Sequence, residues 1–167
     1  PQALILAPTR ERALQTLTTI EKLGRSRRIS ATVIVGGADM QAQVRGLRQR
    51  PEILVATPGR LLDHMWSGNI LLSSIKMLVL DEADRMLDMG FLPAIKKILA
   101  KVPKQRQTLL FSATFDAPIK QLALQFMNDP KEVQVSSQNT VAQTVNHIAY
   151  PVDTAKKREL LMDILTQ

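Results

Sequence analysis

The chain has 167 residues, 45% of them hydrophobic and 22% charged, a composition that excludes collagen-like, low-complexity and intrinsically disordered proteins. It has no cysteine, which excludes thiol catalysis, disulfide frameworks and cysteine-based zinc sites, and its two histidines are too far apart to indicate a histidine metal site. Its 22 basic residues outnumber its 15 acidic residues, and the net charge of +7 fits either a nucleic-acid partner or a mildly basic surface.

The apolar runs and the first residues bear on membranes and targeting. No window approaches the roughly 18 consecutive apolar residues of a membrane span, so we expect no membrane contact. The first residues, Pro1 to Leu4, carry neither a secretory signal nor an initiating methionine. We therefore expect a piece of a longer or processed protein that is located in the cytoplasm.

Short apolar runs alternate along the chain with segments whose apolar residues recur at helical spacing. In chain order we predict a strand at 3–6, a helix ending at 24, a strand at 31–35, a helix at 38–49, a strand at 53–56, a helix around 61–65, a strand at 77–80, a helix around 95–102, a strand at 108–111, a helix around 119–126 and a strand at 132–135. This alternation predicts an α/β fold with a mostly parallel sheet, and the apolar strands indicate helices on both faces.

The last part of the chain differs from this pattern. Residues 136–145 are polar and predict a linker. A strand is predicted near 146–150, and a helical stripe covers 155–165. One strand and one helix cannot form a domain, so we predict a domain at 1–135 and the beginning of a second, truncated one at 146–167.

Polar residues follow almost every predicted strand, at its carboxyl end. They are Pro8-Thr9-Arg10, Gly36-Gly37, Thr57-Pro58-Gly59-Arg60, Asp81 to Asp84 and Ser112-Ala113-Thr114. In parallel α/β sheets, ligands bind beyond the carboxyl ends of the strands. We therefore expect several of these segments to meet at one edge of the sheet.

Asp81, Glu82 and Asp84 directly follow the apolar strand at 77–80, which is the context of a Walker B site. In such a site the first carboxylate holds Mg²⁺, and the next orients or deprotonates an attacking water. Carboxylate oxygens are ligands that suit Mg²⁺. The alternative is an acidic helix N-terminus, where the helix dipole favours carboxylates.

The other strand ends carry hydroxyls, glycines and guanidinium groups. A helix N-terminus such as Thr57-Pro58-Gly59-Arg60 binds phosphate readily, Gly36-Gly37 permits close approach of a ligand, and Arg10 is a candidate phosphate ligand. The alternatives are plain turns and a solvated charge. For Ser112 and Thr114 the alternative is an N-cap, a role that Asp116 fits equally well.

Taken together, these segments resemble the first RecA-like domain of the DEAD-box RNA helicases. The tetrad at 81–84 resembles motif II, 112–114 motif III, 7–11 motif Ia, 36–37 the GG motif and 57–60 motif Ib, in the family's order over residues 1–135. The stretch 79–91 is similar to the bacterial RhlE-type subgroup. Residues 146–167 resemble the entry strand and first helix of the second RecA-like domain.

The resemblance implies roles for individual residues. Asp81 and Glu82 would handle Mg²⁺, mostly through water, and the hydrolytic water, and Asp84 would couple to motif III or to the second domain. Ser112 and Thr114 would link ATP hydrolysis to strand separation. Sequence-independent contacts to the RNA backbone would come from Pro8, Thr9, Arg10, Gly36, Gly37, Thr57, Pro58, Gly59 and Arg60.

The chain departs from the family at the phosphate-binding loop. No G-x-x-x-x-G-K-[ST] motif occurs, and none of its seven glycines precedes a lysine. The resemblance implies that ATP and Mg²⁺ are cofactors of the parent protein. We expect that the 167 residues alone bind ATP weakly and do not hydrolyse it at a useful rate.

Two further departures concern packing. Arg12 stands where motif Ia usually has leucine, so we expect its charge to face solvent or a phosphate.

In RecA-like sheets the strand before the phosphate loop lies beside the strand that ends in motif III. Its absence would leave the strand at 108–111 as an open, apolar edge. We expect self-association there, or pairing with the strand near 146–150.

His64, Trp66 and Met86 are predicted to be packing residues. For the chain as a whole, the principal interpretation is a part of an ATP-dependent RNA helicase. The alternative is an RNA-binding or self-associating module without catalysis. A Mg²⁺-dependent phosphohydrolase built on Asp81, Glu82 and Asp84 is disfavoured, because no second cluster of metal ligands is evident.

Overall fold

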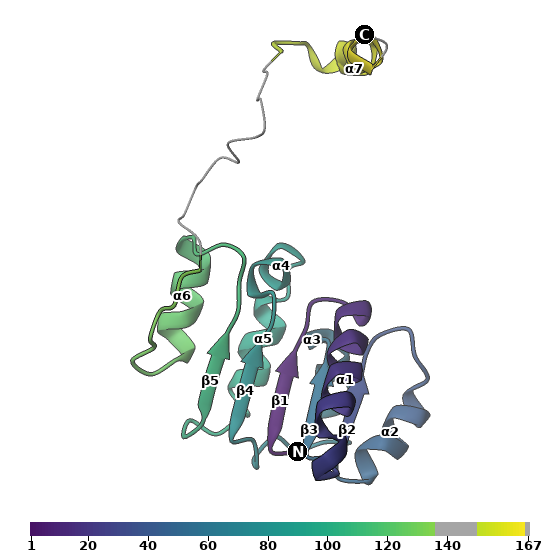
Figure 1. Ribbon diagram of the computed structural model, residues 1–167, viewed down its shortest axis with the longest axis vertical. Helices are drawn as coiled ribbons and strands as arrows, with labels where there is room; N and C mark the ends of the chain where they lie inside the picture. The colour runs from purple at the N-terminus through teal and green to yellow at the C-terminus, as the bar shows by residue number, and fades with distance from the viewer. Residues whose placement is uncertain (136–149, 166–167) are drawn as a thin grey trace. The chain divides into compact units, whose positions relative to one another are not determined.

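In a computed structural model of the chain, residues 1–135 and 150–165 are described, and they divide into two compact units, Pro1–Glu132 and Val133–Gln167. The first unit is built on a five-stranded parallel sheet with the order β2-β3-β1-β4-β5 (Figure 1). Its strands are β1 (Ala3–Leu6), β2 (Ala31–Ile34), β3 (Ile53–Ala56), β4 (Met77–Leu80) and β5 (Gln107–Leu110). The prediction of a parallel α/β sheet is confirmed.

The register of the strands brings their last residues to one edge of the sheet. Leu6 pairs with Ala56 on one side and with Leu80 on the other, and Ile34 and Leu110 continue the same row. The segment after each strand therefore starts at the same level. This alignment explains why residues as far apart in sequence as 9 and 112 reach a common edge.

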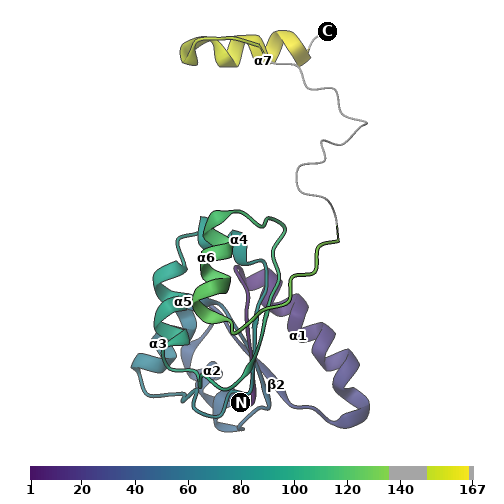
Figure 2. The same ribbon diagram turned by 90° about the vertical axis from the view of Figure 1, so that its left-hand side faces the viewer.

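Helices cover the two faces of the sheet unequally. Figure 2 shows α1 (Arg10–Gly24) on one face and α3 (Pro58–Trp66), α5 (Leu92–Leu99) and α6 (Ala117–Phe126) on the other. Leu47 of α2 (Met40–Arg48) belongs to the same apolar cluster as Leu61 of α3, so α2 lies on the α3 side. The short helix α4 (Ala83–Asp88) follows β4.

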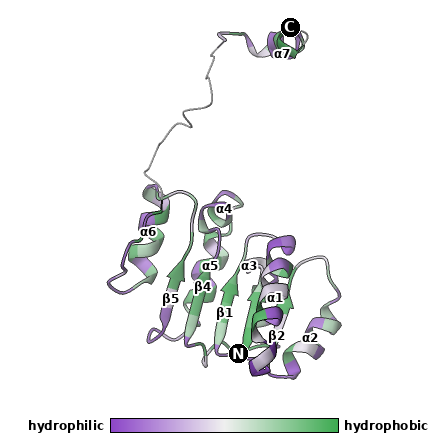
Figure 3. Cartoon of the chain, viewed as in Figure 1, coloured by the Kyte–Doolittle hydropathy of each residue, from purple (hydrophilic) through white to green (hydrophobic). Residues whose placement is uncertain are grey.

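Two apolar clusters hold these layers together. In the larger one, alternate strand residues such as Leu4, Leu6 and Leu78 pack with Ile95 and Ile98 of α5, all of them fully buried. The smaller cluster, Ala7, Ala13, Val35 and Val55, lies beneath α1. Figure 3 shows how uniformly hydrophobic the central strands are, as expected for strands with apolar side chains on both faces.

Some predicted elements differ from the observed ones. The strand predicted at 132–135 is wrong: these residues form no strand, and Val133 and Val135 are almost fully exposed. A short β-branched run needs a neighbouring strand, and β propensity alone does not supply one. The helix α4 is an addition to the predicted elements. The helix predicted around 95–102 ends at Leu99, although Val102 is still buried.

The described residues of the second unit contain a 3-10 turn at Thr154–Lys156 and the helix α7 (Lys157–Leu165). The apolar side chains Leu161, Met162 and Leu165 are exposed on it. The strand predicted near 146–150 lies almost wholly outside the described residues, as does the linker at 136–145. Among the helices at 1–135 and 150–165, none combines the length and the hydropathy of a membrane-spanning segment.

Candidate functional site

Residues 7–9 connect β1 to α1 at the carboxyl edge of the sheet, and Arg10 begins α1. Thr9 is the N-cap of α1, because its hydroxyl oxygen accepts a hydrogen bond from the backbone N–H of Arg12 at 3.2 Å. Arg10 is exposed, and its Nη1 donates to the carbonyl oxygen of Gly37 at 3.4 Å. Gly37 has a φ of +72°, a conformation that favours glycine. The segments predicted to contact RNA after β1 and β2 are therefore adjacent.

Arg60, on the first turn of α3, also binds the backbone of the glycine loop, at the residues on either side of Gly36-Gly37. Its Nε donates to the carbonyl oxygen of Val35 at 3.1 Å, and its Nη2 donates to that of Ala38 at 3.0 Å. Two of the donors of Arg60, which was predicted to contact the RNA backbone, are therefore hydrogen-bonded to carbonyl oxygens of the loop. The segments after β2 and β3 are fastened together, and Pro58 occupies the start of α3 as expected.

A network of polar side chains, Gln43, His64 and Asn69, is hydrogen-bonded to the backbone of the same loop at Val35. Gln43 Nε2 also donates to the carbonyl oxygen of Val35, at 2.9 Å, and Gln43 Oε1 lies 3.0 Å from Nε2 of His64. His64 Nδ1 lies 3.2 Å from the side-chain amide of Asn69. Sequence analysis missed Gln43 and Asn69. The available signal was a glutamine four residues before Leu47, on the apolar stripe of α2.

The three predicted packing residues have different outcomes. His64 and Met86 are fully buried, which confirms the prediction for both. Trp66 is 69% exposed, so the prediction was wrong for this residue. Lys97 Nζ lies 5.4 Å from the centroid of the Trp66 ring. This cation–π contact stabilises the solvent-exposed indole.

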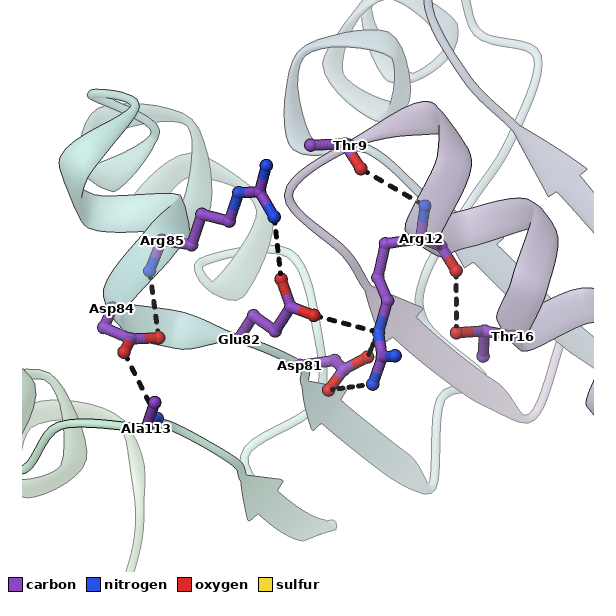
Figure 4. Close-up of polar contacts among 8 residues, drawn as sticks. All are labelled: Thr9, Arg12, Thr16, Asp81, Glu82, Asp84, Arg85 and Ala113. Atoms are coloured by element: carbon purple, nitrogen blue, oxygen red, sulfur yellow. Dashed lines mark hydrogen bonds and ion pairs between the residues drawn. The ribbon is translucent and has the colours of Figure 1, made fainter. Parts of the chain in front are cut away.

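The carboxylates follow β4 beside the first turn of α1 (Figure 4). The backbone N–H of Asp81 donates to the carbonyl oxygen of Leu6 at 2.9 Å, which fixes Asp81 next to the end of β1. Glu82 has a φ of +51° and precedes α4. This left-handed conformation turns the chain between strand and helix, so Asp81 and Glu82 project toward α1.

Arg12 reaches both of these carboxylates (Figure 4). Its Nε donates to Asp81 Oδ2 at 2.7 Å and lies 3.3 Å from Glu82 Oε1, while its Nη2 donates to Asp81 Oδ1 at 3.3 Å. The hydrogen bond with Asp81 raises the pKa of Arg12, against a smaller lowering by burial. The Arg12 side chain is 40% exposed, as the expectation of a solvent-facing charge requires, but the expectation missed that its guanidinium pairs with two carboxylates.

Asp84 links α4 to the segment after β5. Its Oδ2 accepts hydrogen bonds from the backbone N–H groups of Ala113 and Thr114, both at 3.2 Å. Asp116 is the N-cap of α6, so the alternative of an N-cap role for Ser112 or Thr114 is wrong. The hydroxyl oxygen of Ser112 is buried and has no hydrogen-bond partner among the residues that the structure describes.

The donor set of a Mg²⁺ site is only partly present. Asp81 and Glu82 offer the hard oxygens that Mg²⁺ prefers. Arg12, however, engages both oxygens of Asp81. In the described part of the chain, no group of three histidine, cysteine or acidic residues is arranged to hold a metal. Asp81 therefore fits the cation in chemistry, and Arg12 competes with a cation for its oxygens.

The predicted site residues thus form three groups at one edge of the sheet. Arg10, Gly37 and Arg60 form the first, Arg12, Asp81 and Glu82 the second, and Asp84 with Thr114 the third. The first turn of α1 carries both Arg10 and Arg12 and so joins the first group to the second. This arrangement places candidate phosphate contacts directly beside a carboxylate pair.

The chain is similar to known helicases. The model of the DEAD/DEAH box helicase family matches residues 1–122. DEAD-box ATP-dependent RNA helicase CshA of Geobacillus kaustophilus is 42% identical over 164 residues, 98% of this chain and 35% of the relative. ATP-dependent RNA helicase DbpA of Bacillus subtilis is 41% identical over 165 residues, 99% of this chain and 34% of the relative. The chain thus spans about a third of the length of these curated relatives.

Solved structures agree with this similarity. A hypothetical ATP-dependent RNA helicase from Sulfolobus tokodaii has a TM-score of 0.74 at 39% identity, over 78% of this chain and 39% of the other. The yeast DEAD-box splicing factor Prp28 has a TM-score of 0.73 at 38% identity, over 77% and 31% respectively. The names of these four proteins do not specify the RhlE-type subgroup, which stays a prediction.

Proposed function

Because the chain belongs to the DEAD/DEAH-box helicase family, we propose that it is part of an ATP-dependent RNA helicase that unwinds short RNA duplexes or remodels RNA–protein complexes. In this proposal the segments that follow β1, β2 and β3 bind the RNA backbone and are called the RNA grip. The segment that follows β4 supplies the carboxylates. One observation carries it: Arg10 and Arg60 fasten three segments of the predicted RNA site into a single surface.

In the proposed complex, RNA lies across Pro8 to Arg10, the glycine loop and the N-terminus of α3. Backbone N–H groups at a helix N-terminus and an exposed guanidinium favour phosphates over base edges. The chain has only 4% aromatic residues, so stacking of bases is a minor contribution. Binding is therefore independent of sequence and sensitive to salt.

Fluorescence anisotropy with a labelled single-stranded RNA tests the RNA grip. We expect the affinity of the chain to fall steeply with salt, and Arg10→Ala to reduce the slope of log K against log salt by about 0.7, the value for one phosphate contact on a single strand. Lys101→Ala is the matched control, because Lys101 is an exposed cation beyond the end of α5, at the opposite edge of the sheet. Equal losses in the two variants, or a loss confined to one RNA sequence, would contradict this grip.

We propose Asp81 and Glu82 as the residues that would hold Mg²⁺, which supplies charge neutralisation for the phosphates of ATP when bound. The 167 residues contain no phosphate-binding loop motif. We therefore expect phosphate release from ATP by the chain with Mg²⁺ and RNA to equal that of Glu82→Gln. RNA-stimulated release that disappears in Glu82→Gln would show that the chain has a phosphate cradle of another kind.

A second candidate function is self-association, and the position of β5 favours it. β5 is an edge strand, Leu109 and Leu110 are only half-buried, and the neighbouring Phe111 is 55% exposed. An edge strand with exposed apolar residues is a template for pairing with another chain. We propose that two copies of the chain pair through β5.

A further inference from the structure

The most unusual contact at the carboxyl edge is the one between Arg12 and the carboxylates of Asp81 and Glu82. Arg12 engages Asp81 with two nitrogens, at 2.7 and 3.3 Å, and the 2.7 Å bond lies at the short end of the range for a charged pair. The side chain of Asp81 is only 15% exposed, so this contact is partly shielded from water.

Rigid elements hold both partners in position. The backbone N–H of Arg12 donates to Thr9, and its carbonyl oxygen accepts from the hydroxyl of Thr16, within the first turns of α1. The adjacent Ala13 is fully buried against the sheet. Asp81 is fastened to the end of β1 through its backbone. The guanidinium therefore reaches the carboxylate from a fixed helix rather than from a loop.

A divalent cation at Asp81 requires the same oxygens and is repelled by the same positive charge. A guanidinium has no acceptor and cannot ligate a metal, so the two cations compete for the Asp81 carboxylate and repel each other. We propose that Arg12 is an intramolecular counter-cation, a positioning residue that holds Asp81 and Glu82 in the absence of a divalent cation and is displaced when one binds to Asp81. This inference rests on the proposed role of Asp81 as a cation ligand.

Binding of Mn²⁺ to the 167-residue chain, measured by electron paramagnetic resonance of the free ion, tests the inference without ATP or RNA. We expect Arg12→Leu to bind Mn²⁺ about twofold to fivefold more tightly than the unchanged chain, the range expected for loss of one partly exposed competing charge. Asp81→Asn in the Arg12→Leu background abolishes this gain. An Arg12→Leu chain that binds Mn²⁺ no more tightly than the unchanged chain overturns the inference.

Arg85→Leu is the matched control. Arg85 Nη1 lies 3.6 Å from Glu82 Oε2 but makes no contact with Asp81, and its side chain is 60% exposed. We expect it to change Mn²⁺ affinity by less than about twofold, as for an exposed ion pair. Equal gains in Arg85→Leu and Arg12→Leu would mean a general effect of net charge, and the inference would be wrong.

A second variant and a second readout guard against loss of folding. Arg12→Gln keeps most of the side-chain length without the charge, and it is expected to bind Mn²⁺ as tightly as Arg12→Leu. In the unchanged chain, Mg²⁺ is expected to shift the Nε–H resonance of Arg12, and an unmoved resonance at saturating Mg²⁺ would also overturn the inference. Failure of RNA binding in the anisotropy experiment would overturn the proposed RNA grip and leave this result unaffected.

Discussion

At the scale of single residues, the protonation of His64 is fixed by its neighbours. Gln43 Nε2 donates to the carbonyl oxygen of Val35, so Gln43 presents its Oε1 to the imidazole. Nε2 of His64 must then carry the proton, and Nδ1 accepts from the side-chain amide of Asn69. A second proton on Nδ1 would meet this amide donor. The network is complete only with a neutral imidazole.

This network predicts that stability falls in mild acid. Burial lowers the pKa of His64, and the charge of Arg60 lowers it further. The folded chain therefore binds a proton less readily than the unfolded chain, whose histidine has a pKa of about 6.5. Stability is complete above this pH and declines as the pH falls below it, by up to about 1.4 kcal/mol per pH unit, until the folded pKa is reached.

Thermal unfolding at pH 7.5 and 5.5 measures this effect. We expect the melting temperature of the unchanged chain to be lower at the acidic pH and His64→Gln to be much less sensitive to pH, whatever its absolute stability. His147→Gln, which replaces the only other histidine, is the control and keeps the full pH dependence. The same pH dependence in His64→Gln as in the unchanged chain would show that another group is responsible.

At the scale of elements, the sheet was predictable because its strands have apolar side chains on both faces. Each of the five strands lies within one residue of its predicted range. A short, continuous apolar run such as Leu78-Val79-Leu80 is typical of a parallel strand that is covered on both faces. The meeting of the strand ends was predictable for the same reason. The helix α4 was not, because its six residues are too few for a periodic pattern.

The contacts within the site depend on pairs that sequence patterns do not reveal. Arg12 and Asp81 are 69 residues apart, and a single charge on a helix has no periodic signal. The family usually has leucine at the position of Arg12, and the expectation for a charge there was solvent or a phosphate. Only the register of β1 against β4 brings Asp81 within reach of α1.

The contact between α4 and the segment after β5 gives a prediction at this scale. Asp84 accepts the backbone N–H groups of Ala113 and Thr114, and hydrogen bonds to a charged acceptor contribute about 1.5–3 kcal/mol each. We expect Asp84→Ala to speed hydrogen exchange of these two amides at least about tenfold, because local opening becomes easier. Asp88→Ala, at an exposed position of the same helix, is the control. Unchanged exchange at Ala113 and Thr114 would show that the segment is held by other contacts.

At the scale of the whole molecule, the open side of β5 decides whether copies of the chain pair. The backbone N–H groups of Gln107 and Phe111 face β4: they donate to the carbonyl oxygens of Lys76, just before β4, and of Leu80, its last residue. Because N–H groups alternate in direction along a strand, those of Thr108 and Leu110 point away from β4. These two outward groups are what a second chain would use.

Light scattering across a concentration series tests pairing through this edge. We expect the apparent mass of the chain to rise with concentration, and Thr108→Pro to keep it monomeric, because proline removes an outward N–H and is tolerated in an edge strand. Thr108→Ala is the matched control: it loses the hydroxyl contact with Arg106 but keeps the N–H, so it associates like the unchanged chain. A strictly monomeric unchanged chain at the highest concentration would contradict self-association. Association that persists in Thr108→Pro would place the interface away from β5, with the exposed apolar residues of α7 as the next surface to change.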